Sequence, residues 1–182
     1  GYVPPRHRGN EVSRQLASRV CVSEDRVLIL QADADTQYSS GYVSAMREYA
    51  SRAGAGVLVE AAVDHTHEDK LRYQGYFAAC QRADDEMEPV FAAEADDVIV
   101  DDKACGYWLS DYTRWGGHRR EYTAAGEEIH AETTRLYLRA KAYGARRFRG
   151  QGAVAFHSAR RLEEETLAHV ASAGFPREPS WK

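Results

Sequence analysis

The sequence predicts an α/β protein in which a layered, mixed sheet is covered by helices on both faces. Short apolar runs of strand length alternate with longer segments whose apolar residues recur at helical spacing. The apolar runs are continuous rather than alternating, which is typical of strands that are buried on both faces. At 182 residues the chain is long enough to bury a full core, and we expect one domain over residues 1–182.

The first part of the chain supplies two helices and two strands. Residues 10–20 carry apolar side chains four positions apart and are expected to form a helix. Residues 26–32 are a continuous apolar run and are expected to form a buried strand. Residues 40–56 return to helical spacing and end at glycines, and residues 56–63 predict the second strand.

The rest of the chain continues the alternation. Residues 71–86 predict a helix, and residues 97–102 predict a short third strand. The longest helical pattern covers residues 125–145, where Gly144 supplies the C-terminal stop. Residues 153–158 predict another strand, and residues 160–174 predict a final charged helix.

Composition excludes several classes of protein. The net charge of -4 and the pI near 6.0 argue against a nucleic-acid-binding surface, which is normally basic. No apolar run approaches the roughly 18 residues of a transmembrane helix. The three cysteines are widely spaced, as in proteins of a reducing compartment. We therefore expect a cytoplasmic protein, either free or peripheral at the inner face of the membrane.

Two acidic residues follow the strand at 26–32. Ligands of open α/β sheets bind just beyond the carboxyl ends of strands, and Asp33 and Asp35 lie at such an end. A D-x-D pair can direct both carboxylates toward one hard cation, Mg²⁺ or Mn²⁺. Alternatively, Asp35 or Thr36 caps the following helix. The two residues alone leave both interpretations open.

Five segments, taken in order, resemble the family 2 glycosyltransferases of the GT-A fold. These are RGNEVSRQLA, VLILQADADTQYSSGYV, ACGYWLSDYTRWGG, AGEEIHAETTRLYLRAKAYGA and AVAFHSARR. The resemblance covers nearly the whole chain. It implies a GT-A-like sheet and a reaction that transfers a sugar, with inversion, from a nucleoside-diphosphate donor to a hydroxyl of a glycan, lipid or other acceptor.

The family begins with a strand-rich segment that binds the nucleotide base, and no such segment precedes Gly1 in this sequence. The resemblance therefore implies an N-terminally incomplete GT-A-like fold. An uncovered sheet edge tends to pair with another chain. We expect a second copy of the protein or a partner chain to cover that edge.

The resemblance also assigns donor-side residues. It implies that Asp33, Asp35 and His157 hold Mn²⁺ or Mg²⁺ and, through it, the donor diphosphate. The donor-binding positions correspond to Asp33, Asp35, Arg14, Arg135 and Arg139. The alternatives are purely structural: a hydrogen-bonded histidine at a strand end, and arginines that pair with nearby acids.

The catalytic base implied by the resemblance lies in the segment AGEEIH. Glu127 and Glu128 match a Gly-Glu-Asp helix start, and Glu128 takes the position of the base. The family commonly has the shorter aspartate there. Acidic residues are also favoured in the first turn of any helix because of its macrodipole.

The acceptor side is implied by the segment ACGYWLSDYTRWGG. Gly116 and Gly117 match a Gly-Gly turn that borders the acceptor site, and Trp108 and Trp115 could stack on sugar rings. An ordinary tight turn and buried core aromatics are the alternatives.

A further polar segment, residues 64–70, could place His65, His67 and Asp69 around a metal or could be a simple turn.

Two other classes of function remain open. One is a non-catalytic or incomplete GT-A-like module that needs a partner chain. The other is a metal-dependent phosphoryl or nucleotidyl transferase that uses the same aspartates. The haloacid-dehalogenase pattern D-x-D-x-T is not matched, because position 37 is glutamine and Thr36 follows Asp35 directly.

Overall fold

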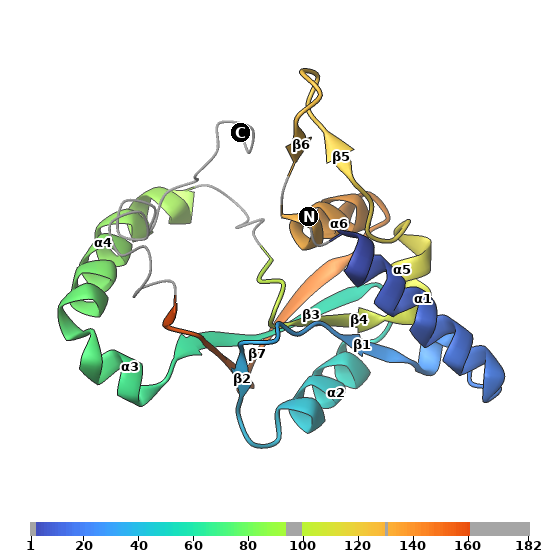
Figure 1. Cartoon of the computed structure of the whole chain (residues 1–182), viewed down its shortest axis with the longest axis horizontal. Coiled ribbons are helices and arrows are strands. Elements are labelled where there is room, and N and C mark those ends of the chain that lie inside the picture. Colours follow the sequence, from blue (N-terminus) through green and yellow to red (C-terminus); the bar gives the residue numbers. More distant parts are fainter. Residues whose placement is uncertain (1–2, 94–99, 130, 161–182) are drawn as a thin grey trace.

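The computed structural model describes residues 3–93, 100–129 and 131–160. Within these ranges the chain forms a mixed sheet in the order β1-β4-β3-β7-β2 (Figure 1). The strands of this sheet are β1 (Leu28–Leu30), β2 (Gln37–Tyr38), β3 (Val57–His65), β4 (Cys105–Trp108) and β7 (Arg146–His157). Strands β3 and β7 pair in parallel, and the other neighbours are antiparallel. The α/β class and the mixed sheet are therefore confirmed.

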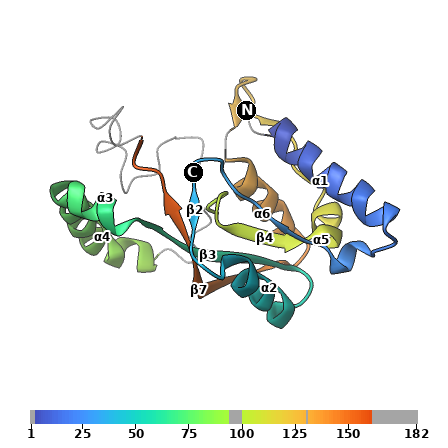
Figure 2. The same ribbon diagram turned by 60° about the horizontal axis from the view of Figure 1, so that its bottom comes forward.

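Helices cover both faces of this sheet (Figures 1 and 2). Helix α2 (Tyr42–Ala53) lies on one face. Helices α5 (Leu109–Arg114) and α6 (Glu132–Ala142) lie on the other, with α1 (Val3–Arg19) beside α5. A short 3₁₀ turn, η1 (Glu24–Arg26), leads into β1.

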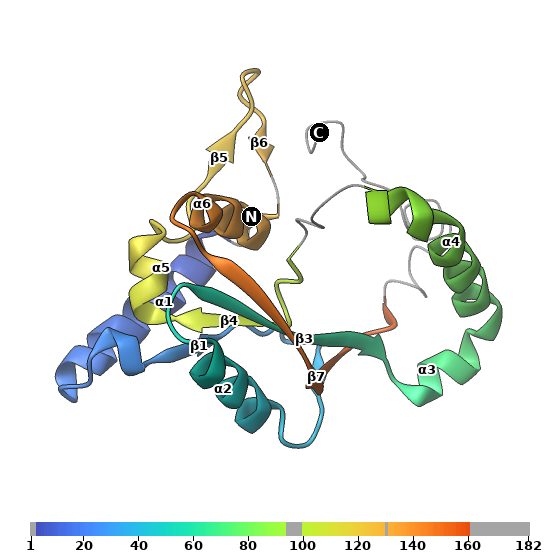
Figure 3. The ribbon, with the colours of Figure 1, turned by 180° about the vertical axis from the view of Figure 1, so that it is seen from behind.

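Two further features extend from the sheet. Helices α3 (His67–Arg72) and α4 (Gln74–Ala93) follow the end of β3 and lie apart from the other helices (Figure 3). A hairpin of β5 (Glu121–Tyr122) and β6 (Glu128–Ile129) projects beyond α6. None of the helices in the described ranges is long and apolar enough to cross a membrane.

The core is divided by β3. Val57 and Val59 pack with α2, whereas the intervening Leu58 packs with α5 and α6. This division follows from the two-residue period of a strand, which sends successive side chains to opposite faces. The first five residues of β3 are all buried, as a strand covered on both faces requires. Strand β1 is only half-buried, so its continuous apolar run overstates its burial.

The prediction of a strand at residues 97–102 is wrong for the part that can be examined. Residues 97–99 lie outside the described residues, and residues 100–102 belong to no strand. The strand is β4, a few residues later. Its Gly106 allows close approach to β1, because a Cβ there would lie 2.7 Å from Leu30 Cδ2 and 2.8 Å from the Ile29 carbonyl oxygen. A segment with a glycine at its centre therefore forms an inner strand that the apolar pattern did not reveal.

The prediction of one helix over residues 125–145 is also wrong at its start. Helix α6 begins at Glu132. The preceding Ala131 has a left-handed backbone with φ of 63°, which prevents the helix from continuing toward its N-terminus. Gly126 turns the chain with φ of 86°, so that β5 and β6 pair as a hairpin. Glu127 and Glu128 therefore do not lie at a helix start.

Other boundaries differ in smaller ways. Helix α1 begins earlier than expected, with two prolines in its first turn, where their fixed φ is tolerated. The segment at 64–70 forms the end of β3 and the start of α3, where the Thr66 side chain accepts a hydrogen bond from the Asp69 amide at 3.1 Å. The expected helix at 160–174 lies outside the described residues, apart from Arg160.

Candidate functional site

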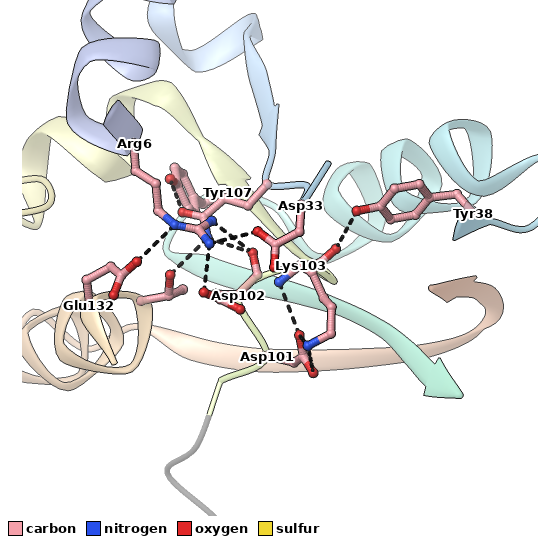
Figure 4. Close-up of polar contacts among 10 residues, drawn as sticks. Arg6, Asp33, Tyr38, Asp101, Asp102, Lys103, Tyr107 and Glu132 are labelled. Carbon is pink, nitrogen blue, oxygen red and sulfur yellow. Dashed lines mark hydrogen bonds and ion pairs between the residues drawn. The ribbon is translucent and has the colours of Figure 1, made fainter. Parts of the chain in front are cut away.

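The most concentrated group of charges lies where β1 ends, and its centre is Arg6 of α1 (Figure 4). The Arg6 guanidinium pairs with Asp33 at 3.0 Å, with Asp102 at 2.7 Å and with Glu132 at 3.0 Å. We call these four residues the Arg6 cluster. Asp33 follows β1, Asp102 precedes β4, and Glu132 begins α6, so three separate segments converge on one guanidinium. Its planar fork of five N–H donors suits such a shared arrangement.

A buried network of hydrogen bonds holds the Arg6 cluster in place. Gln31 donates from Nε2 to the Asp102 carbonyl at 3.0 Å and to Thr133 Oγ1 at 2.9 Å. The Tyr107 hydroxyl donates to Gln31 Oε1 at 2.9 Å, and Asn10 Nδ2 donates to the Tyr107 oxygen at 3.3 Å. The network therefore links α1, β1, β4 and α6 behind the charged groups.

A second group of charges adjoins the cluster. The Lys103 ammonium lies 2.9 Å from Asp101 Oδ1, and His157 Nε2 lies 3.6 Å from Asp101 Oδ2. Burial alone would raise the pKa of Asp101, but the hydrogen bond to His157 and the charge of Lys103 outweigh it and lower the pKa to about 2. Asp101 is therefore a fixed anion that orients its two partners.

Asp102 behaves differently from its neighbour. Burial raises the pKa of Asp102 above its usual value; Arg6 opposes the shift, and the nearby charges of Asp33 and Asp101 add to it. A carboxylate whose pKa is raised holds a proton more readily and is better suited to proton transfer near neutral pH. On electrostatic grounds, Asp102 is the acid–base candidate of the cluster.

The predicted metal ligands do not share one point. Asp33 pairs with Arg6, whereas Asp35 is exposed and its Oδ2 lies 3.2 Å from Arg160. His157 pairs with Asp101 instead. Among the described residues, no group of three His, Cys, Asp or Glu side chains is placed to hold a metal ion. In this arrangement the three residues do not fit a metal, and Mn²⁺ or Mg²⁺ stays a prediction.

Neither Asp35 nor Thr36 caps a helix. Strand β2 follows them, and α2 begins after Gly41, which offers no side-chain cap. The helix-cap alternative for the D-x-D segment is therefore wrong. The Thr36 amide donates to the Asp33 carbonyl at 3.3 Å, which closes a turn between β1 and β2.

The predicted base lies on a different part of the molecule. Glu127 is exposed, and Glu128 is half-buried with its carboxylate 3.6 Å from Arg120. Both belong to the hairpin that projects beyond α6 (Figures 1 and 3). The acidic residue that does lie at the start of α6 is Glu132 of the Arg6 cluster.

The predicted donor-side arginines lie outside the cluster. Arg14 is an exposed partner of Glu11 one helical turn away. Arg139 pairs with Glu121 and donates to the Gly117 carbonyl, so it ties α6 to the Gly-Gly turn. Arg135 lies half-buried on α6. The structural alternative, in which the arginines pair with nearby acids, fits Arg14 and Arg139 in this structure.

The predicted acceptor-side residues are mainly structural. Gly116 and Gly117 have φ of 81° and 65°, a conformation that favours glycine. Trp115 is 2% exposed and packs in the core with α5 and α6, so it offers no face to a sugar. Trp108 is half-buried and donates from Nε1 to the Gly54 carbonyl at 3.2 Å.

The candidate histidine site at residues 64–70 is divided between two elements. His65 ends β3, with its ring centroid 5.3 Å from that of His157. His67 and Asp69 lie in α3. The alternating positions that would be needed for a shared metal in an extended segment are therefore not formed.

The sequence analysis missed most of the Arg6 cluster. Arg6, Asp102 and Glu132 were not singled out. A usable signal was present at Asp101 and Asp102, because two acidic residues follow an apolar run there much as they do at Asp33. Arg6 carries no local signal, since its role depends on how α1 packs across the ends of distant strands.

No family model, curated protein or solved structure matches the chain. The interpretation of the site therefore depends on its own residues.

Beside the Gly-Gly turn lies a buried histidine that predicts a pH-dependent stability. His118 is 3% exposed, and neither ring nitrogen has a partner in the described part of the chain. Burial, together with the charges of Arg6, Arg139 and His7, lowers the pKa of His118 to about 3. The unfolded chain takes up this proton near pH 6.5 but the folded chain does not. Stability present at pH 7 is therefore lost as the pH falls from 6.5 toward 3.

We expect His118→Phe to remove this dependence. Between pH 7 and pH 5 the wild-type chain should lose about 2 kcal/mol of unfolding free energy through this group, and the variant should not. Urea denaturation at the two pH values measures the difference. His67→Phe, at an exposed position of α3, is the matched control and should keep the wild-type dependence. An unchanged pH dependence in His118→Phe would contradict the assignment.

Proposed function

We propose that this chain acts as a GT-A-like glycosyltransferase that moves a sugar from a nucleoside-diphosphate donor to a hydroxyl acceptor. The observation that carries the proposal is the convergence of Asp33, Asp102 and Glu132 on Arg6 beyond the carboxyl end of β1. Ligands of open α/β sheets bind at such ends. The resemblance of the sequence segments to family 2 glycosyltransferases supports the same reaction class.

Sugar transfer needs a group that takes the proton of the attacking hydroxyl. Asp102 is suited to this step, because its carboxylate is about one third exposed and its pKa is raised by burial and by neighbouring negative charge. Glu132 is less suited, since its side chain is only 10% exposed. We therefore assign the role of general base to Asp102. Glu132 holds Arg6 in position.

The reaction also needs positive charge where the diphosphate leaves. Arg6, Lys103 and Arg160 lie around the acidic residues and can supply fixed cationic donors. Arginine is well suited to phosphate because its N–H groups bind two oxygens at once. Attack on the face opposite to the leaving group inverts the anomeric carbon, as in single-displacement glycosidases.

A thermal-shift panel tests the proposal. It comprises nucleoside diphosphates and their sugar conjugates, each with and without Mn²⁺, because the metal stays a prediction. A donor at about 100 times its dissociation constant should stabilise the folded chain by about 2.7 kcal/mol. For a chain of this size that corresponds to a rise in Tm of roughly 5–10 °C. Release of the nucleoside diphosphate is then measured for each donor that binds, and the absence of any stabilisation would overturn the proposal.

A second candidate is a non-catalytic module of the same fold. One observation favours it: both aspartates of the D-x-D segment are already paired with arginines of the same chain. This candidate predicts either no donor binding or binding without release of the diphosphate. Hydrolysis of a simple aryl phosphate in the same assay would instead favour a phosphoryl transferase.

A further inference from the structure

A cavity of about 460 Å³ opens beside the Arg6 cluster. It is lined by the end of β1 and residues 31–32, by Tyr38 and Ser39, and by residues 41–44 at the start of α2. A volume of this size and a mainly apolar lining with a few polar groups are typical of small-molecule sites. Neither the D-x-D segment nor the proposed base lines it, so the cavity is a separate feature.

Two residues that line the cavity, Gln31 and Tyr38, are hydrogen-bonded to the candidate site. The Tyr38 hydroxyl donates to the Lys103 carbonyl at 3.0 Å, as Figure 4 shows. Gln31 donates to the Asp102 carbonyl at 3.0 Å. A molecule in the cavity would therefore lie against residues that are bonded directly to the proposed base and its neighbour.

The chemistry of the lining indicates the class of ligand. The rings of Tyr38 and Tyr42 lie 4.5 Å apart and tilted by 55°, an arrangement that can be extended by a third ring through edge-to-face contacts. Tyr42 is 5% exposed and its hydroxyl is buried, so the half-buried ring of Tyr38 offers most of the aromatic surface that a ligand can reach.

We infer that this cavity binds an aromatic ring, as the apolar part of the acceptor. The assignment to the acceptor rests on the proposed function, whereas the binding of the ring does not. The ring packs against the ring of Tyr38, in continuation of the Tyr38–Tyr42 pair. The reacting hydroxyl of the acceptor then extends toward Asp102.

The test uses two probes that differ only in the aglycone. They are 4-nitrophenyl β-glucoside, which carries an aryl ring, and methyl β-glucoside, which does not. Isothermal calorimetry should show the aryl probe binding at least tenfold more tightly than the methyl probe. Equal affinities, or no binding of the aryl probe, would overturn the inference.

Two tryptophan variants locate the binding. Ser44 is exposed on the cavity wall, so Ser44→Trp fills the cavity from a position where the core is not disturbed. Glu48→Trp, one turn later on the same helix and outside the cavity lining, is the matched control. Ser44→Trp should weaken binding of the aryl probe at least tenfold, and Glu48→Trp should leave it unchanged. Equal binding by both variants would overturn the location.

The binding assays with the aryl probe and with nucleotide sugars test the two proposals separately. If Ser44→Trp weakens binding of the aryl probe but no nucleotide sugar binds, the inference about the cavity is supported and the proposed function is contradicted. If donors bind but the aryl probe does not, the cavity inference fails alone.

Discussion

Replacing Arg6 with alanine is expected to lower the unfolding free energy at pH 7 by about 2–4 kcal/mol. The change leaves Asp33, Asp102 and Glu132 close together without the cation that they share. Removal of one partner from a fully buried ion pair costs about 3–5 kcal/mol. We take a lower range here, because the Asp33 and Asp102 side chains are 37% and 35% exposed and water screens part of their repulsion.

Urea denaturation measures this loss, and Arg14→Ala is the matched control. Arg14 lies on the same helix and pairs with Glu11, but it is exposed, so its removal should change stability by less than about 0.5 kcal/mol. If Arg6→Ala cost no more than Arg14→Ala, the cluster would not be a stabilising unit.

The loss at Arg6 should also depend on pH. Arg6 opposes the rise in the pKa of Asp102, so its removal should raise that pKa further. The gap in unfolding free energy between wild type and Arg6→Ala is complete where Asp102 is ionised in both proteins. The gap should therefore be largest near pH 7 and narrow as the pH falls toward 4 and Asp102 takes up a proton, first in the variant and then in wild type. A gap that stays constant across this range would indicate lost packing rather than lost charge pairing.

How far the sequence could predict the fold depends on how local each signal is. The strand around Val57 to Ala61 and the helix that begins at Tyr42 were predicted, because their apolar patterns are long and uninterrupted. Strand β4 was missed, because its Gly106 replaces a side chain with close backbone packing against β1. That contact joins segments about 75 residues apart and leaves only a weak trace in local composition.

The same reasoning explains the candidate site. Asp33 was predicted because an acidic residue directly after a buried strand is a local pattern. Arg6 could not be predicted in this way, since nothing in its own segment shows that it meets Asp102 and Glu132 from distant parts of the chain. The helix start was misplaced by several residues because the turn at Gly126 and the left-handed Ala131 interrupt an apparently helical pattern.

The structure also explains why two aspartates are tolerated just beyond the carboxyl end of β1. Each is neutralised by an arginine of the chain, Asp33 by Arg6 and Asp35 by Arg160. Asp102 also pairs with Arg6, but burial and two neighbouring aspartates still raise its pKa. Reactivity is therefore expected at a residue that the D-x-D pattern does not contain.

Asp102→Asn is expected to reduce kcat for sugar transfer by about 10²–10⁴-fold, the range typical of removing a general base. The donor is the one that the thermal-shift panel identifies, and its dissociation constant should stay within about threefold of wild type. An asparagine oxygen can still accept from Arg6, so the cluster keeps its geometry. Because burial already disfavours the charged form of Asp102, the uncharged variant should be as stable as wild type at pH 7, and a loss of activity cannot be attributed to unfolding.

Glu128→Gln is the decisive comparison, because it tests the base that the sequence resemblance implied. Glu128 lies on the β5–β6 hairpin beside Arg120, away from the Arg6 cluster. Its variant should therefore keep kcat within about threefold of wild type, since it touches neither Asp102 nor the cations around it. The opposite result, with Asp102→Asn active and Glu128→Gln inactive, would require the hairpin to fold toward the end of β1 during the reaction. It would return the catalytic role to the residue that the sequence alone selected.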